Sequence, residues 1–98
     1  MGKYIFIYKG FDFSPVFDLE YFKKRYPQVV SAIGDNPFRL FSNFVFYGIP
    51  NGVQGSAQFN PRKYRYSEEN ILLNVLYDNN WEKYYLNYLE KIKLNKSR

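Results

Sequence analysis

The chain has 98 residues, a net charge of +5 and 22% aromatic residues, and it contains no cysteine or histidine. These numbers exclude disulfide bonds, thiolate zinc sites and histidine-based acid–base catalysis, and the positive charge favours an anionic partner. The length fits a single domain over residues 1–98, and a hydrophobic fraction of 46% predicts a chain that folds without a partner.

The location of the protein is predicted from its apolar segments. The N-terminal apolar run spans only residues 4–8, which is too short for a signal-peptide core. No stretch approaches the roughly 20 apolar residues that cross a bilayer. We therefore expect a cytoplasmic protein with no membrane partner.

The first predicted element is a strand over residues 3–9, in which large side chains on both faces indicate cover on both sides. A helix follows, and two starts fit the sequence. In one, Ser14 is the N-cap and Pro15 the first helical residue. In the other, Asp18 is the N-cap, with Phe17 and Phe22 packing across it.

The middle of the chain predicts one more short helix and then a β-hairpin. Residues 28–33 fit a helical turn or a short strand, and we favour the helix. A breaker at 34–37 precedes a predicted strand over 38–49, where aromatic and aliphatic residues alternate. Asn51-Gly52 is typical of a tight hairpin turn, so residues 43–49 are expected to pair with a third strand at 53–59.

The last third predicts a basic connector and two helices. Residues 62–66 follow Asn60-Pro61 and suit a short edge strand. Ser67 is the expected N-cap of the next helix, and a final helix runs from about Asn80 to Lys93. The expected inward stripe of the final helix is Trp81, Tyr85, Tyr88, Leu89 and Ile92, and the expected core face of the helix after Ser67 is Ile71, Leu72, Val75 and Leu76.

The order strand, helix, hairpin, helix, helix predicts an α+β fold. We expect a small antiparallel sheet of three or four strands with the helices packed on one face.

A basic and aromatic cluster is the main candidate for a binding surface, because alternating cations and rings bind phosphates and stack on bases. Edge-strand protection explains the charges at 62–66 equally well, and lysines at a helix C-terminus are favourable in any case. The candidate nucleic-acid-binding residues are Arg62, Lys63, Tyr64, Arg65, Tyr66, Lys91 and Lys93.

Exposed tyrosines give the alternative prediction, a small protein-interaction module. Eleven tyrosines and ten phenylalanines exceed what a core of this size holds, so some must lie at the surface. A homodimer interface explains such a surface as well as a ligand does. In composition the chain resembles the small proteins that viruses and phages encode, which implies a host protein as a partner. The expected exposed tyrosines are Tyr64, Tyr66, Tyr84 and Tyr88.

Catalysis is the third functional interpretation of the sequence and has the least support. Asp12, Asp18 and Glu20 are close enough in sequence to suggest a divalent-metal site of a nuclease, but helix capping and solvation explain them fully. We therefore expect a non-enzymatic binding protein of DNA or RNA, with no cofactor, no metal and no catalytic residue.

Overall fold

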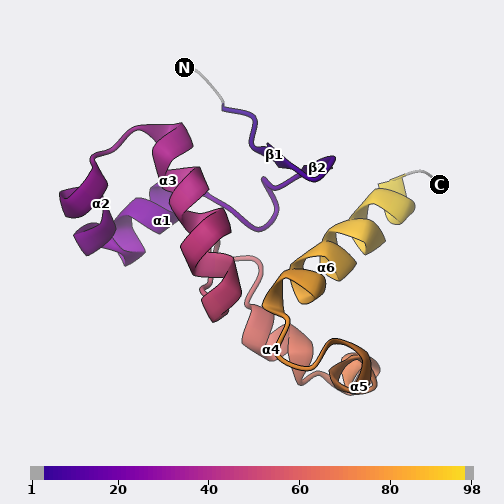
Figure 1. Cartoon of the computed structure of the whole chain (residues 1–98). Helices are drawn as coiled ribbons and strands as arrows, with labels where there is room; N and C mark the ends of the chain where they lie inside the picture. The colour runs from indigo at the N-terminus through magenta and orange to yellow at the C-terminus, as the bar shows by residue number, and fades with distance from the viewer. Residues whose placement is uncertain (1–3, 97–98) are drawn as a thin grey trace.

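The computed structural model describes residues 4–96 and is mostly helical, with one very small antiparallel sheet (Figure 1). The elements in chain order are β1 (Ile7–Tyr8), β2 (Phe11–Asp12), α1 (Leu19–Arg25), α2 (Pro27–Ile33), α3 (Pro37–Asn43), a π-helical turn (Phe44–Gly48), a 3-10 turn (Ile49–Asn51), α4 (Pro61–Arg65), a second 3-10 turn (Glu68–Asn70), α5 (Leu73–Tyr77) and α6 (Trp81–Lys96). The mixed helix and strand class is confirmed, whereas the sheet of three or four strands is wrong.

The sheet is a hairpin closed by two residues with left-handed backbone. Lys9 and Gly10 have φ values of 52° and 80°, which match the turn that best joins two twisted strands. Tyr8 pairs with Phe11. The expected cover on both faces is wrong, because Ile5 and Ile7 are 70% and 60% exposed.

The local signals for the first two helices are confirmed. Of the two predicted starts, the structure adopts the later one: the Asp18 carboxylate accepts hydrogen bonds from the backbone N–H groups of Glu20 and Tyr21. Phe17 and Phe22 pack across the cap with ring centroids 5.3 Å apart. Residues 28–33 are helical, within α2.

The predicted strand over 38–49 is wrong, because this segment is helical from Pro37 to Asn51. The Asn36 side chain accepts hydrogen bonds from the N–H groups of Phe38 and Arg39, and Pro37 fills the first turn, where its missing N–H costs nothing. Most positions from Phe38 to Ile49 are apolar, with polar residues at 39, 42 and 43, so the segment fits a helical period as well as an alternating one. Its buried hydrophobic residues are Leu40, Phe41, Phe44, Val45 and Ile49.

The predicted hairpin at Asn51-Gly52 is also wrong. Gly52 ends the helical run with φ of 69°, and its N–H donates to the carbonyl of Ile49. Residues 53–59 are irregular, with one isolated bridge between Ser56 and Phe59. Gly55 is needed there because a Cβ at this position would lie 2.6 Å from the Phe44 ring.

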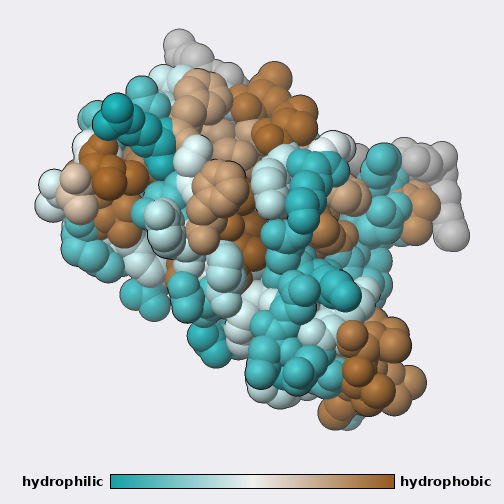
Figure 2. Space-filling model, in the orientation of Figure 1, coloured by the Kyte–Doolittle hydropathy of each residue, from teal (hydrophilic) through white to brown (hydrophobic). Residues whose placement is uncertain are grey.

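The three predictions for the last third differ in outcome. α6 confirms the final helix, with Tyr85 and Leu89 buried. Residues 62–66 lie in and just after α4 instead of an edge strand. The predicted core face of the segment after Ser67 is wrong, because all four of its side chains are exposed, and Figure 2 shows the resulting hydrophobic patch over α5.

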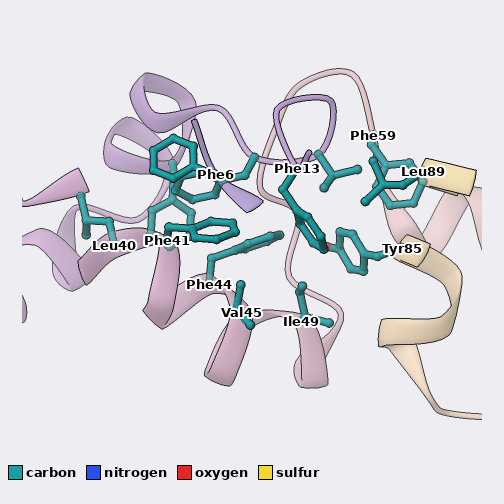
Figure 3. Close-up of a cluster of buried hydrophobic side chains, with 13 residues drawn as sticks. Phe6, Phe13, Leu40, Phe41, Phe44, Val45, Ile49, Phe59, Tyr85 and Leu89 are labelled. Atoms are coloured by element: carbon teal, nitrogen blue, oxygen red, sulfur yellow. The ribbon is translucent and has the colours of Figure 1, made fainter. Parts of the chain in front are cut away.

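An aromatic core joins the N-terminal half to α6 (Figure 3). The Phe44 ring lies 5.2 Å from Phe17 and 5.6 Å from Tyr85, which in turn lies 5.1 Å from Phe59. The Tyr85 hydroxyl donates to the Val53 carbonyl. Burial raises the pKa of Tyr85, since a phenolate would be poorly solvated there. The core thus depends on rings from the segment before α1, the π-helical turn after α3, the irregular segment at 53–59 and α6 together.

Replacing Leu89 with Ala should lower the free energy of unfolding by about 2–5 kcal/mol, because this side chain is only 3% exposed and its loss leaves a cavity. Leu94 lies on the same helix and is 56% exposed, so Leu94→Ala should change stability by no more than about 0.5 kcal/mol. Urea denaturation of the two variants compares them directly. Equal losses would contradict the inward orientation of Leu89.

Candidate functional site

The basic and aromatic cluster predicted at 62–66 lies on and beside the short helix α4. The Asn60 side chain caps this helix by accepting hydrogen bonds from the N–H groups of Arg62 and Lys63, at 2.9 Å and 3.4 Å. Alternate residues of a strand would point to opposite sides, but in a helix they do not. The cluster is therefore divided among different neighbours.

The two arginines of α4 contact Trp81 at the start of α6. The Arg62 and Arg65 guanidinium groups lie 4.9 Å and 5.0 Å from the indole ring, within cation–π range. Arg62 also donates to the Asn51 carbonyl at 3.2 Å. Arg65 is only 8% exposed, so it serves the internal structure and is not presented to a phosphate.

Tyr64 is the centre of a second group that does combine predicted residues. Its ring lies 5.5 Å from Tyr88, and its hydroxyl donates to Asn87. The Lys91 ammonium lies 5.4 Å from the Tyr64 ring centroid. Lys63 and Tyr64 line a polar groove of about 480 Å³. Burial raises the pKa of Tyr64, and Lys91 opposes that rise.

The remaining predicted residues lie apart from this group. Tyr66 is 64% exposed, beside Arg65. Lys93 lies over the Phe11 ring of β2, at 5.5 Å. Tyr84, which was expected at the surface, is fully buried. The structure thus brings Lys91 to the Tyr64 ring and places Lys63 beside Tyr64 on the groove, whereas Arg65 and Lys93 contact Trp81 and Phe11.

Residues 4–96 form neither a metal site nor a membrane-spanning helix. No group of three carboxylate, histidine or cysteine side chains in this range is placed to hold a metal ion. No helix in the same range is long and apolar enough to span a bilayer.

Known proteins give no guide to the site. No family model, curated protein or solved structure matches this chain. The geometry of the chain therefore carries the functional argument alone.

The most unusual surface of the molecule lies on residues 71–76. Four aliphatic side chains stand next to one another there, facing solvent (Figure 2). Burying one such side chain is worth roughly 1.5–3 kcal/mol, so leaving four outside forgoes a large stabilisation. We call this surface the 71–76 ridge, and its members are Ile71 (57% exposed), Leu72 (75%), Val75 (80%) and Leu76 (70%).

The polar side chains of the same segment face inward. Asn70 is only 2% exposed, and its amide donates to the Tyr64 carbonyl at 3.1 Å while accepting from Lys91 at 3.2 Å. The Asn74 amide donates to the Arg65 carbonyl at 3.1 Å. The segment is therefore inverted relative to an ordinary amphipathic helix, with amides inside and aliphatic groups outside.

Arg65 holds the segment in this inverted position. Its guanidinium donates to the side-chain oxygens of Asn74 and, at 3.3 Å, Asn79. The Tyr84 hydroxyl donates to the same Asn74 oxygen at 3.1 Å. Turning the ridge inward would remove these partners from Arg65 and Tyr84, and unsatisfied buried polar groups are costly.

Replacing Asn74 with Ala should therefore lower the free energy of unfolding by about 1–3 kcal/mol, the usual cost of leaving buried donors without a partner. Asn95→Ala, an exposed change in the last turn of α6, should have an effect within about 0.5 kcal/mol. Thermal or urea denaturation measures both. A neutral Asn74→Ala would show that Arg65 does not depend on this amide.

Proposed function

We propose that this chain is a non-enzymatic protein-binding module and that the 71–76 ridge is its binding surface. The observation that carries the proposal is the exposure of four adjacent aliphatic side chains on a segment whose polar side chains are bonded inward. Contiguous apolar surface on a soluble domain is typical of protein-interaction sites. The sequence predicted a protein-interaction surface formed by tyrosines; we now assign that surface to the ridge.

The spacing within the ridge suits a partner with an apolar groove. Leu72, Val75 and Leu76 stand at i, i+3 and i+4, which is how a helix presents anchors to a groove. The ridge residues begin in the turns before α5 and continue along it. The three anchors therefore form a compact protrusion that a concave surface accommodates.

The charges around the ridge indicate a basic rim on that groove. Glu68, Glu69 and Asp78 are exposed and flank the ridge in sequence, and residues 66–82 contain no lysine or arginine. Glu69 also lines the polar groove of Lys63 and Tyr64, and the nearest cation at the other end of α5 is Lys83, 5.9 Å from the Tyr77 ring. Complementary charge speeds association and selects the correct partner. The acidic border also disfavours nucleic acid at this end of the molecule, although the chain as a whole is basic.

Nucleic-acid binding is the second candidate, and the grouping of Lys63, Lys91 and the Tyr64 ring favours it. Lys91 lies over the Tyr64 ring, and Lys63 and Tyr64 line the polar groove together with Glu69. The nucleic-acid candidate is weakened because Arg62 and Arg65, two of the predicted phosphate ligands, contact Trp81 instead. We therefore rank nucleic-acid binding second, after protein binding by the ridge.

The ridge proposal predicts that a photoreactive residue in place of Leu76 cross-links a defined protein, and that adding Leu72→Lys reduces the cross-link at least ~10-fold, a loss of about 1.4 kcal/mol of binding free energy. Leu94→Lys is the matched control, since Leu94 is an exposed leucine outside the ridge and its change should leave the cross-link intact. Mass spectrometry of the adducts gives the readout.

Retention of nucleic acid by the wild type and its variants separates the two candidate functions. If the wild type and Leu72→Lys both retain RNA or DNA at about 0.15 M salt, where surface charges are already screened beyond roughly 8 Å, and Lys63→Ala/Lys91→Ala loses it, the nucleic-acid candidate replaces the ridge proposal. A Leu76 probe that cross-links nothing would also overturn it.

A further inference from the structure

A second exposed apolar surface lies on the other half of the molecule. It is a groove of about 420 Å³ between the end of α2 and the helical run from α3. Phe38, Phe46 and Tyr47 line it and are 53%, 65% and 70% exposed. We call this surface the aromatic groove; its other lining residues are Ile33, Asn36, Arg39, Ser42 and Asn43.

The charge of the aromatic groove is opposite to that of the ridge. Arg39 is its one charged lining residue, and the exposed Asp35 stands next to the lining residue Asn36 in sequence without lining the groove itself. Within residues 4–96 the ion pairs are Lys9–Glu82 and Lys23–Glu20, so neither Arg39 nor the acids beside the ridge are paired. An apolar protrusion with an acidic border and an apolar groove with a basic group are complementary in shape class and in charge.

One chain cannot bring its own ridge and groove together. α2 and α3 lie at one end of the molecule in Figure 1 and α5 lies at the other, and the chain measures 39 Å along its longest axis. A contact between the ridge and the groove must therefore join two copies.

We propose that the aromatic groove of one copy receives the 71–76 ridge of a second copy, head to tail; this inference rests on the ridge being a protein-binding surface. Symmetric pairing is disfavoured, because two ridges would bring the acids Glu68, Glu69 and Asp78 of each copy together, and two grooves would bring Arg39 against Arg39. Only the mixed pairing joins opposite charges.

A head-to-tail contact uses different surfaces on the two copies. Each bound pair therefore leaves one free ridge and one free groove, and further copies add until a ring closes or an open chain grows. Assembly should rise with protein concentration beyond a dimer. Salt should weaken it, since the charges around both surfaces are exposed.

Two variants that each lose one surface test this pairing. Leu72→Lys/Val75→Lys removes the ridge, and Phe46→Glu introduces an acid into the groove. Arg39→Glu provides a milder groove variant should Phe46→Glu fold poorly. The fold of each is checked by circular dichroism, and sedimentation velocity measures the assembly of each alone and of equimolar mixtures.

The proposal predicts that the purified wild type assembles, that each variant alone is monomeric, and that the mixture forms a one-to-one heterodimer and nothing larger. The intact groove of the ridge variant then binds the intact ridge of the groove variant. The dissociation constant of the mixed pair should be at least ~10-fold lower than that of either variant with itself.

Three results would overturn the pairing. Self-association of the groove variants would indicate contact between ridges, and a monomeric mixture would exclude the head-to-tail contact. A wild type that stays monomeric up to its solubility limit would reject the second copy as the partner. In that last case the Leu76 probe still decides the broader proposal: a cross-link to another protein would retain ridge binding, and no cross-link at all would reject both.

Discussion

The buried guanidinium of Arg65 is the constraint on which the surface of this protein depends. An ionised group removed from water costs several kcal/mol unless charge and hydrogen-bonding partners surround it. Here no carboxylate pairs with it among the described residues. Its partners are the amide oxygens of Asn74 and Asn79 and the faces of Trp81 and Tyr84.

These partners settle which side of the 67–80 segment faces inward. Because Asn74 must reach Arg65, and Asn70 is bonded to Tyr64 and Lys91, the aliphatic residues between them are turned to solvent. The buried hydrogen bonds of Asn70 and Asn74 therefore leave the apolar ridge exposed on the outside. It also removes Arg65 from the basic surface, so the same interaction weakens the nucleic-acid reading and strengthens the protein-binding one.

Parts of the fold that depend on neighbouring residues could be predicted from the sequence. The Asp18 cap with Phe17 and Phe22 was one of two starts that local spacing allowed, and the helix at 28–33 was the favoured of two interpretations. The helical period of α6 placed Tyr85 and Leu89 inward correctly but missed the buried Tyr84. The helix at 37–51 could have been found from Asn36-Pro37, a cap and first-turn pair. Apolar residues predominate in the segment after it and fit an alternating period as well as a helical one, so the period alone did not identify the helix.

The ridge and the division of the 62–66 cluster were harder to predict, because both depend on contacts between residues far apart in the sequence. Asn70 and Asn74 share the spacing of Ile71 and Val75, so the segment carries a polar and an apolar stripe of equal period. Which stripe faces inward depends on Arg65, a residue outside the segment whose burial nothing in its own neighbourhood indicates. Likewise, the arginines of 62–66 contact Trp81 and Tyr64 contacts Tyr88, so the division of this cluster depends on α6, far along the chain.

Solvent exposure of the ridge methyl groups tests the account most directly. In an NMR experiment with a soluble paramagnetic probe, at a dilution where the chain is monomeric, the methyls of Leu72 and Val75 should broaden as strongly as those of the exposed Leu94. The methyls of the buried Ile49 should stay sharp. Ridge methyls protected to the same degree as Ile49 would mean that the segment packs its aliphatic side inward, and would contradict the inverted arrangement set by Arg65.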